Sequence, residues 1–513
     1  MSQNYVRSET KGIDRYMIAT SLGALLVGFV FRWAVSIGSY SGEGKPPMFG
    51  DYEAQRHWME ITYQLPVKQW YVNSTENDLL YWGLDYPPLT AYHSWLMGFI
   101  GHKWNSSWVA LGSSRGLETY THKMFMRATV AIADLLVFLP AVVVYVAFCQ
   151  KQRGSAASIG LYIATHVLFP GMILMDYGHF QYNCVSLGLF CWAVIAIMAK
   201  KDLLGSFLFV CALNYKQMEL YHAFPFFFYL LGSCIRSDSL FQGLSKLIMV
   251  GATVIGSFTV LWFPFLRDID VALQVVRRIF PVNRGLFEDK VANVWCALSV
   301  QFKWRNYDID YLLLLSTASV LLAVAPSSLL LLLRPTRSNF KKSLLISSLT
   351  FFLFSFQVHE KSILLAAIPA LLTLHEDVFA CGWFLLVSVI SLFPLCVKDG
   401  TVIAFFALAV FYYVWLWDVH DFAPVRRSPE SKWSLSNLLT IASHASVIGG
   451  LGLCAVSTVA APPQRFPDLF PLLNAIYCCA HFCLFLLYFN YRMLFDRATP
   501  IHHTPAKTKR KTQ

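Results

Sequence analysis

Charged side chains are scarce in this chain of 513 residues: they make up 14% of it, whereas hydrophobic side chains make up 56%. This composition excludes an ordinary soluble globular protein. The apolar runs are continuous and show no alternation of period two, which excludes a transmembrane β-barrel. The sequence also has no CxxC metal motif, no Walker motif and no glycine-rich phosphate loop. Its 12 cysteines fall mostly inside apolar runs, which indicates helix packing and argues against a disulfide framework.

The sequence is rich in long apolar runs. A helix needs ~20 apolar residues to cross a bilayer core ~30 Å thick, and on that basis we predict an all-α polytopic membrane protein with about fourteen transmembrane helices. The first run contains Arg32 and lacks a small-residue cleavage site, so we interpret it as a retained span and not as a signal peptide. The predicted spans are residues 16–37, 124–149, 157–175, 183–199, 203–213, 219–234, 247–266, 309–333, 343–358, 362–375, 379–396, 401–418, 436–460 and 468–489.

The distribution of Lys and Arg predicts the orientation of these spans. If they alternate from a cytosolic N-terminus, most basic residues of the short connections fall on the cytosolic side, as the positive-inside rule expects. The short opposite loops keep only Lys216, Lys361, Lys398 and Arg465. The asymmetry accounts for most of the net charge of +11, so nucleic-acid binding is not expected.

This orientation sends a large first loop, residues 38–123, and a second loop, residues 267–305, to the lumen and leaves both termini in the cytosol. Two glycosylation sequons, which begin at Asn73 and Asn105, fall in the first loop and agree with that side. The chain ends in a basic tail with Arg510-Lys511, at the position of a cytosolic retrieval signal; an ordinary polybasic tail is the alternative.

Two carboxylates of the first loop are the leading candidates for chemistry. Asp51 opens a pattern that predicts a short amphipathic helix on the membrane surface, in which it acts either as a helix cap or as a general base facing a cavity. Asp85 precedes Tyr86-Pro87-Pro88, where a turn-and-cap role is at least as well founded as a chemical one. Glu53, Arg56 and His57 lie in the same loop and are candidates with them.

Further polar clusters emerge on the same predicted side, at residues 176–183, 214–222, 280–295 and 358–362. Such groups next to apolar spans are costly unless they are paired or solvated, so together they predict a wet luminal site. For any single residue a helix cap or loop salt bridge stays an alternative, and the scattered histidines favour structural hydrogen bonding over a metal site. Within the second span Arg127 and Asp134 lie one to two turns apart and could pair, with Arg32 nearby, and we interpret them as structural or as the wall of a cavity.

Six runs of residues, from about 49 to 364, together resemble the endoplasmic-reticulum dolichyl-phosphate-glucose glucosyltransferase family. They are GDYEAQRHWMEI, YWGLDYPPLTAYHSW, GHFQYN, NYKQMELYHAFPFF, FPVNRGLFEDKVANVWC and FSFQVHEKSILL. The resemblance is closest to the branch that adds the first glucose, by an α-1,3 linkage, to the lipid-linked high-mannose oligosaccharide. One alternative is the branch that adds the second glucose, which shares the LDYPP, HFQYN and HEK cores. Another is a non-enzymatic transporter, which would be expected to show repeated halves that this sequence lacks.

The resemblance implies a GT-C glycosyltransferase fold in the endoplasmic-reticulum membrane, with a luminal active site and a role in N-glycosylation. It implies dolichyl phosphate glucose as the donor substrate, the dolichyl-pyrophosphate-linked oligosaccharide as the acceptor, and no cofactor. It further implies a catalytic module, residues 1–305, followed by a variable transmembrane module, residues 306–513, that ends in the cytosolic basic tail. Asp51 matches the acidic motif that carries the catalytic base in this class.

The expected chemistry is consistent with that assignment. A β-glucosyl phosphate that gives an α-linkage is inverted, so one carboxylate must take the proton of the acceptor hydroxyl. The phosphate leaves without a general acid, and cations stabilise its charge, so no metal is predicted. The cation candidates are Lys216, Arg284, Lys290, His359 and Lys361. The other predicted substrate contacts are Asp85, Tyr86, His179, Gln181, Tyr182, Glu219, Glu288 and Glu360.

Overall fold

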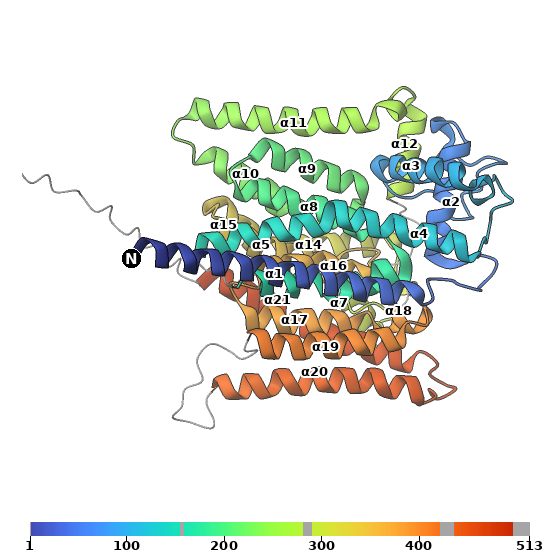
Figure 1. Ribbon diagram of the computed structural model, residues 1–513. Coiled ribbons are helices and arrows are strands. Elements are labelled where there is room, and N and C mark those ends of the chain that lie inside the picture. Colours follow the sequence, from blue (N-terminus) through green and yellow to red (C-terminus); the bar gives the residue numbers. More distant parts are fainter. Residues whose placement is uncertain (1, 154–157, 281–289, 421–434, 496–513) are drawn as a thin grey trace, which may run out of the picture.

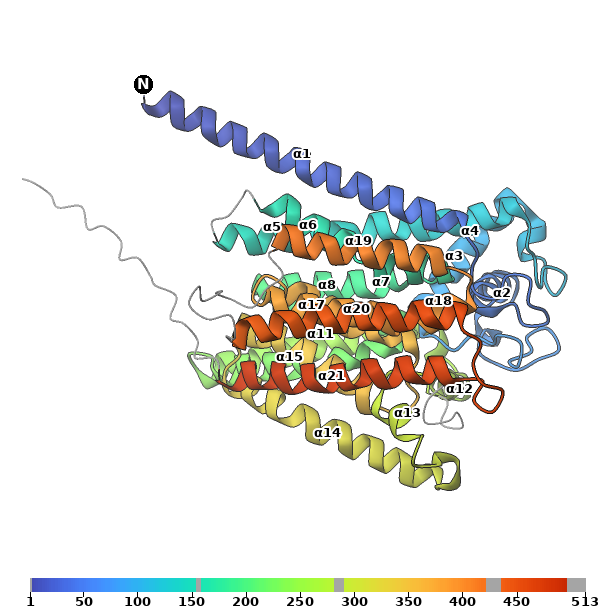
Figure 2. The same ribbon diagram turned by 90° about the horizontal axis from the view of Figure 1, so that it is seen from below.

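The protein is a bundle of helices, as the computed structural model shows for residues 2–153, 158–280, 290–420 and 435–495 (Figure 1). No strand occurs among these residues, so the all-α class is confirmed for them. In Figure 2 the long helices run in nearly one direction, and short helices and loops gather at one end. We call that end the loop face; it holds α2 (Gly50–Gln64), α3 (Pro88–Trp104) and α12 (Ile269–Ile279), opposite the N-terminal end of α1 (Ser2–Ile37).

Each predicted span overlaps a helix, and within the described part of the chain nine stretches are long and apolar enough to cross a membrane. They are Met17–Ile37 of α1; Tyr120–Cys149, built from α4 (Tyr120–Ala133), η3 (Asp134–Phe138) and α5 (Leu139–Arg153); Ile159–Phe180, built from α6 (Ile159–Val167), α7 (Pro170–Met172) and η4 (Ile173–Phe180); α11 (Leu240–Leu266); α14 (Ile309–Leu333); Val378–Lys398, built from α17 (Val378–Ser391) and α18 (Phe393–Lys398); α19 (Val402–His420); Asn437–Val459 of α20 (Leu435–Val459); and α21 (Leu469–Phe495).

The other five predicted spans fall on shorter or less apolar helices. These are α8 (Asn183–Met198), α9 (Asp202–Tyr215), α10 (Ala223–Ile235), α15 (Arg337–Phe354) and α16 (Leu364–Thr373). The remaining short elements are η1 (Val67–Gln69), η2 (Ser106–Val109), η5 (Gln217–His222), α13 (Val294–Leu298), η6 (Trp304–Asn306) and η7 (Glu360–Ile363). The protein is therefore a multi-pass membrane protein, while fourteen crossings and the division at residue 305 stay predictions.

Burial separates inner helices from outer ones. Of the apolar window in Ile159–Phe180, 89% of the residues are buried, and α8, α15 and α16 are also largely buried. In α11 only 11% of the window is buried, which leaves an apolar helix with most of its surface available to lipid. The inner helices therefore form the core, and their loop-face ends are the rigid positions from which polar side chains can project.

Two buried charged residues inside the bundle, Asp134 and Arg127, have different partners from those that the sequence suggested. Asp134 accepts a hydrogen bond from Arg32 of α1 at 2.7 Å and another from the Tyr177 hydroxyl at 2.8 Å. Arg127 instead donates to the carbonyls of Ser39 and Gly178, both at 3.1 Å. The pair of Arg127 with Asp134 that the sequence suggested is therefore not formed, because α1 brings a closer cation to the buried carboxylate. Pairing offsets the high cost of a charge at this depth.

The first helix of the loop face also departs from the prediction. Residues Gly50–Gln64 form α2, as the polar and apolar pattern predicted, but its residues from Tyr52 to Thr62 are all buried. It packs closely against α3. The helix is thus an internal support of the loop face and not a helix that lies on the membrane surface.

Candidate active site

Asp51 occupies the first turn of α2, and a glycine shapes the backbone before it. Gly50 has a φ of +67°, and a Cβ added there would lie 2.7 Å from the carbonyl carbon of Ser41. The Asp51 amide donates to the Ser41 hydroxyl at 3.2 Å. The N-cap position belongs to Phe49, whose side chain makes no capping bond. The capping interpretation of Asp51 therefore has no support, and its side chain is directed to other partners.

Three side chains surround the Asp51 carboxylate. Its Oδ2 lies 3.0 Å from His179 Nε2, accepts from Gln181 Nε2 at 2.7 Å, and forms an ion pair with the Lys361 ammonium. Burial acts to raise the pKa of Asp51, but the Lys361 charge and the contact with His179 outweigh it and hold the pKa well below its usual range. Its side chain remains 27% exposed. At neutral pH Asp51 is therefore an accessible carboxylate that can accept a proton.

The end of η4 brings His179 and Gln181 to this carboxylate. Residues Ile173–Phe180 adopt a π-helix, a rare form that is frequent at functional sites. Phe180, at its end, has a φ of +84°, which is uncommon for a residue with a side chain. The chain turns there, so that the residues on both sides of Phe180 bond to Asp51. The backbone carbonyl of His179 also accepts from the Ser41 amide at 3.0 Å, which ties this turn to the start of the first loop.

A second cation reaches the site through Gln181. Lys216, which directly follows α9, donates to Asn183 Oδ1 at 2.6 Å and to Gln181 Oε1 at 3.3 Å. Burial, with the nearby charge of Lys361, lowers the pKa of Lys216 to about 8. The lysine is still mostly protonated at pH 7, so a second cation lies beside Gln181 in addition to Lys361, which pairs with Asp51.

These groups line one cavity of about 880 Å³ at the loop face. Its volume lies in the range of pockets that hold small-molecule ligands, ~300 to 1,000 Å³. Nine of the residues predicted from sequence line it: Asp51, Asp85, Tyr86, His179, Gln181, Lys216, His359, Glu360 and Lys361. They come from five separate segments of the chain, so the structure joins what the sequence spreads over some 300 residues.

Other predicted site residues do not line this cavity. The Tyr182 hydroxyl lies 2.6 Å from Thr129 Oγ1 in the interior, and Glu219 lies 2.8 Å from His222 Nδ1 with no exposed surface. Lys290 forms an ion pair with Asp468 at 3.1 Å and lines a smaller neighbouring cavity of about 300 Å³. The predicted substrate contact of these residues has no support in this geometry. Arg284 and Glu288 lie outside the described residues.

Several residues that line the cavity were not predicted. They include Gln55, Gln217, Arg278, Lys398 and Asp399. Arg278 of α12 donates to the carbonyls of Gly83 at 2.7 Å and Leu84 at 3.2 Å, and thereby holds the segment that carries Asp85. The sequence signal that could have pointed to Arg278 was its position in the amphipathic stretch after α11. Asp399 offered a weaker one, a single carboxylate between two apolar runs.

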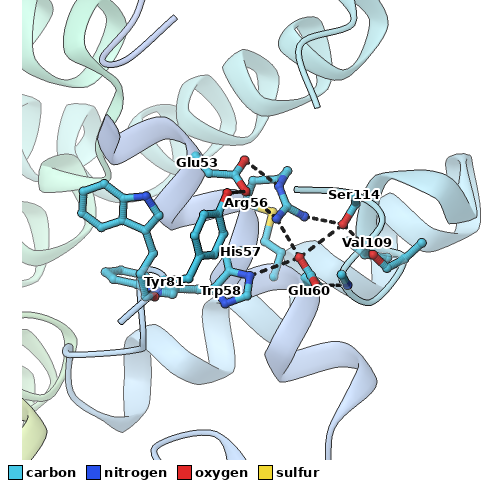
Figure 3. Close-up of polar contacts among 12 residues, drawn as sticks. Glu53, Arg56, His57, Trp58, Glu60, Tyr81, Val109 and Ser114 are labelled. Atoms are coloured by element: carbon cyan, nitrogen blue, oxygen red, sulfur yellow. Dashed lines mark hydrogen bonds and ion pairs between the residues drawn. The ribbon is translucent and has the colours of Figure 1, made fainter. Parts of the chain in front are cut away.

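The other charged residues of α2 form an internal network (Figure 3). Arg56 donates to Glu53 at 2.7 and 2.8 Å, to Glu60 at 2.6 Å and to Ser114 at 2.6 Å. Glu60 in turn lies 3.1 Å from His57 Nδ1 and accepts from the Gly112 amide at 2.6 Å. Glu53, Arg56 and His57 do not line the cavity, so they are candidates for the support of α2 and not for chemistry. Removing one partner of such a buried set leaves a charge uncompensated.

The described residues contain no group of three or more His, Cys, Asp or Glu side chains placed to hold a metal ion. Asp51 and Glu53 do not form a two-carboxylate site, because Glu53 bonds to Arg56 and to the Tyr81 hydroxyl at 2.9 Å. That the reaction needs no metal stays a prediction.

The fold and the cavity define a multi-span membrane protein with a polar cavity at the end of its bundle, in which the Asp51 carboxylate pairs with Lys361. Residues 28–488 match the profile of the ALG6, ALG8 glycosyltransferase family. The chain is 48% identical over 488 residues to the mouse dolichyl pyrophosphate Man9GlcNAc2 alpha-1,3-glucosyltransferase and 47% identical over 488 residues to the chicken protein of that name. In both cases 92% of this chain and 96% of the relative are covered. The chain belongs to the ALG6, ALG8 glycosyltransferase family.

Proposed function

We propose that this protein transfers the first glucose from dolichyl phosphate glucose to Man9GlcNAc2-pyrophosphate-dolichol, with an α-1,3 linkage. The observation that carries the proposal is the Asp51 carboxylate, kept deprotonated between Lys361 and His179 in a cavity at the loop face. Relatives that cover nearly the whole chain bear the name of this activity, which supports the choice of acceptor.

In the proposed reaction Asp51 accepts the proton of the acceptor hydroxyl as that oxygen attacks C1 of the glucose. The bond between C1 and the phosphate oxygen breaks on the opposite face, and the electron pair leaves with dolichyl phosphate. One base suffices because the phosphate is a stable anion that needs no proton to leave.

The leaving phosphate requires compensating positive charge. Lys361 and Lys216 line the cavity with their ammonium groups directed to the side chains around Asp51, and His359 lines the same wall. Charge-assisted hydrogen bonds to phosphate are roughly twice as strong as neutral ones, so these lysines are suited to hold the donor phosphate. The protein needs no nucleotide site for such a donor.

The test is transfer by the purified protein between defined substrates. We expect glucose from dolichyl phosphate glucose to appear on Man9GlcNAc2-pyrophosphate-dolichol as one added hexose, detected by mass spectrometry of the released glycan. An acceptor that already carries the first glucose should not react, which separates this activity from that of the branch adding the second glucose. Movement of lipid across vesicles without a new glycosidic bond would contradict the proposal and favour a transporter.

We further propose that the loop face lies in the lumen of the endoplasmic reticulum and that both termini are cytosolic. The charge asymmetry of the sequence supports this orientation. So does the exposure of both sequon asparagines, Asn73 and Asn105, at the loop face.

A glycosylation experiment checks the orientation. We expect enzymatic deglycosylation to shift the protein on a gel and the double change Asn73→Gln and Asn105→Gln to abolish that shift, because only luminal sequons meet the modifying enzyme. Protease added to sealed microsomes should spare the loop of residues 38–123 and cut it once the membrane is permeabilised. Cleavage of this loop in sealed microsomes would place it in the cytosol and overturn the proposal.

A further inference from the structure

Asp399, a carboxylate far from Asp51 in sequence, lies on the other side of His179 from Asp51. Asp399 Oδ2 lies 2.7 Å from His179 Nδ1, and His179 Nε2 lies 3.0 Å from Asp51 Oδ2. The imidazole therefore bridges two carboxylates through its two nitrogens. The Asp399 and His179 side chains are almost wholly buried, at 4% and 3% exposure, whereas that of Asp51 is 27% exposed. Asp51 is thus far more accessible from the cavity than His179 or Asp399.

The start of the first loop fixes the turn that carries Asp399. Asp399 follows α18, and its carbonyl accepts a hydrogen bond from the Ser39 hydroxyl. Lys45 donates to the carbonyl of Lys398 at 2.6 Å. The next residue, Gly400, has a φ of +70°, and a Cβ there would lie 2.9 Å from Ser39 Oγ, so the turn requires glycine. The turn is thereby held against the loop that leads to Asp51.

The contacts of His179 assign its hydrogen. Lys361 Nζ lies 3.1 Å from His179 Nε2, and an ammonium group can only donate. Nε2 therefore offers its lone pair in this arrangement, and the hydrogen of the neutral ring sits on Nδ1, where Asp399 accepts it. A carboxylate on one nitrogen that fixes the tautomer and supports the imidazolium is the logic of a hydrolase triad.

We propose that Asp399 is a positioning residue for glucosyl transfer. It orients His179, so that the imidazole can accept the proton that Asp51 takes from the acceptor hydroxyl. The inference rests on the proposed function, because it deepens the role of the same site. It also makes a residue from the predicted variable half of the chain part of the reaction.

The proton balance is as follows. The acceptor O–H bond breaks as the new bond from that oxygen to C1 forms, and the proton binds Asp51 Oδ2. It then passes over the 3.0 Å contact to His179 Nε2, which restores the Asp51 carboxylate. The resulting imidazolium donates to Asp399 from Nδ1 and to Asp51 from Nε2. The electron pair of the broken C1–O bond leaves with the lipid phosphate, and the proton is later lost to solvent through Asp51.

The charges around His179 come from every neighbouring segment. Asp51 of α2, Lys361 of η7 and Asp399 after α18 contact the ring. From α4, Arg127 donates to the adjacent Gly178 carbonyl, and Lys216 lies one residue further along the network, bonded to Gln181. Because Asp51 and His179 share the proton, the pH profile of the reaction reports the pair and not either residue alone.

The variant Asp399→Asn tests the inference in the full-length purified protein. Its amide can donate to Nδ1 and so favours the wrong tautomer, and it cannot stabilise an imidazolium. We expect kcat to fall ~10²- to 10⁴-fold with little change in the KM for donor. In a plot of kcat against pH, the fall of kcat on the acid side (the acid limb) should move to lower pH, because an imidazolium without its carboxylate partner loses its proton more readily. Asp399→Glu keeps a carboxylate, so it should recover part of the lost kcat and bring the acid limb back toward its original pH.

The matched control is Glu43→Gln, which neutralises an exposed carboxylate of the same face that pairs with Lys123 at 3.1 Å. We expect it to behave like the unmodified protein. A near-normal kcat of Asp399→Asn, or a lower kcat with an unmoved acid limb and no recovery in Asp399→Glu, would overturn the inference and leave the proposed function standing. Absence of transfer by the unmodified protein would overturn both.

Discussion

Asp51→Asn is expected to abolish nearly all glucose transfer while the protein still folds and binds its donor. Asparagine has the size of aspartate and can still bond to Gln181 and His179, so the local packing survives. It cannot accept the proton of the acceptor hydroxyl, and loss of a general base typically costs ~10² to 10⁴ in rate. Single-turnover transfer with saturating acceptor measures the effect, and donor binding measured on the same preparation shows that the fold is intact.

Asp85→Asn is the matched control for this experiment. Asp85 lines the same cavity, and its carbonyl accepts from Gln217 at 3.1 Å, which fits a role in the turn before α3. We expect this variant to lose much less activity than Asp51→Asn. Near-normal turnover of Asp51→Asn together with a dead Asp85→Asn would show that the base is Asp85 and that the two roles are exchanged.

The parts of the site that could be predicted are those where polar residues break an apolar context. His179, Gln181 and Lys361 stand directly beside apolar spans, where an uncompensated charge or imidazole is costly, and all three contact Asp51. The helix that begins near Asp51 was predicted from its pattern for the same reason. Local sequence suffices in these cases because the signal lies within a few residues.

Side-chain direction within a polar cluster could not be predicted. Gln181 bonds to Asp51 in the cavity, whereas its neighbour Tyr182 bonds to Thr129 in the interior. The turn at Phe180, with its positive φ, decides which side chain faces which way, and nothing in the sequence marks it. The spacing of Glu53 and Arg56 was informative in hindsight, since residues three apart on a helix are neighbours and can pair.

Long-range partners are the other part that sequence could not supply. Asp399 meets His179 across 220 residues of chain, and Arg32 meets Asp134 across 102. For Asp134 the sequence offered Arg127, with Arg32 nearby, and for His179 it offered no partner. The packing of distant helices determines both pairs. The predicted catalytic module therefore omits Asp399, which the structure brings into contact with it.

Lys361→Gln is expected to weaken donor use and to move the pH dependence of the reaction in the opposite direction to Asp399→Asn. Lys361 pairs with Asp51 and lines the cavity, so it is placed to serve both the base and the donor phosphate. Loss of a hydrogen bond to a charged group costs ~1.5 to 3 kcal/mol, which corresponds to a rise of ~10- to 150-fold in the KM for donor.

The same change should shift the acid limb of kcat. The charge of Lys361 helps to hold the pKa of Asp51 low, so its removal lets that pKa rise toward the usual range, and the base becomes protonated at a higher pH. The acid limb is therefore expected to move to higher pH, whereas Asp399→Asn moves it to lower pH. Lys361→Arg keeps the charge and should recover part of both effects, and Lys123→Gln, at an exposed pair with Glu43 outside the cavity, should change neither. Unaltered donor kinetics and an unmoved limb in Lys361→Gln would show that this lysine is neither the phosphate clamp nor the cation that keeps Asp51 ionised.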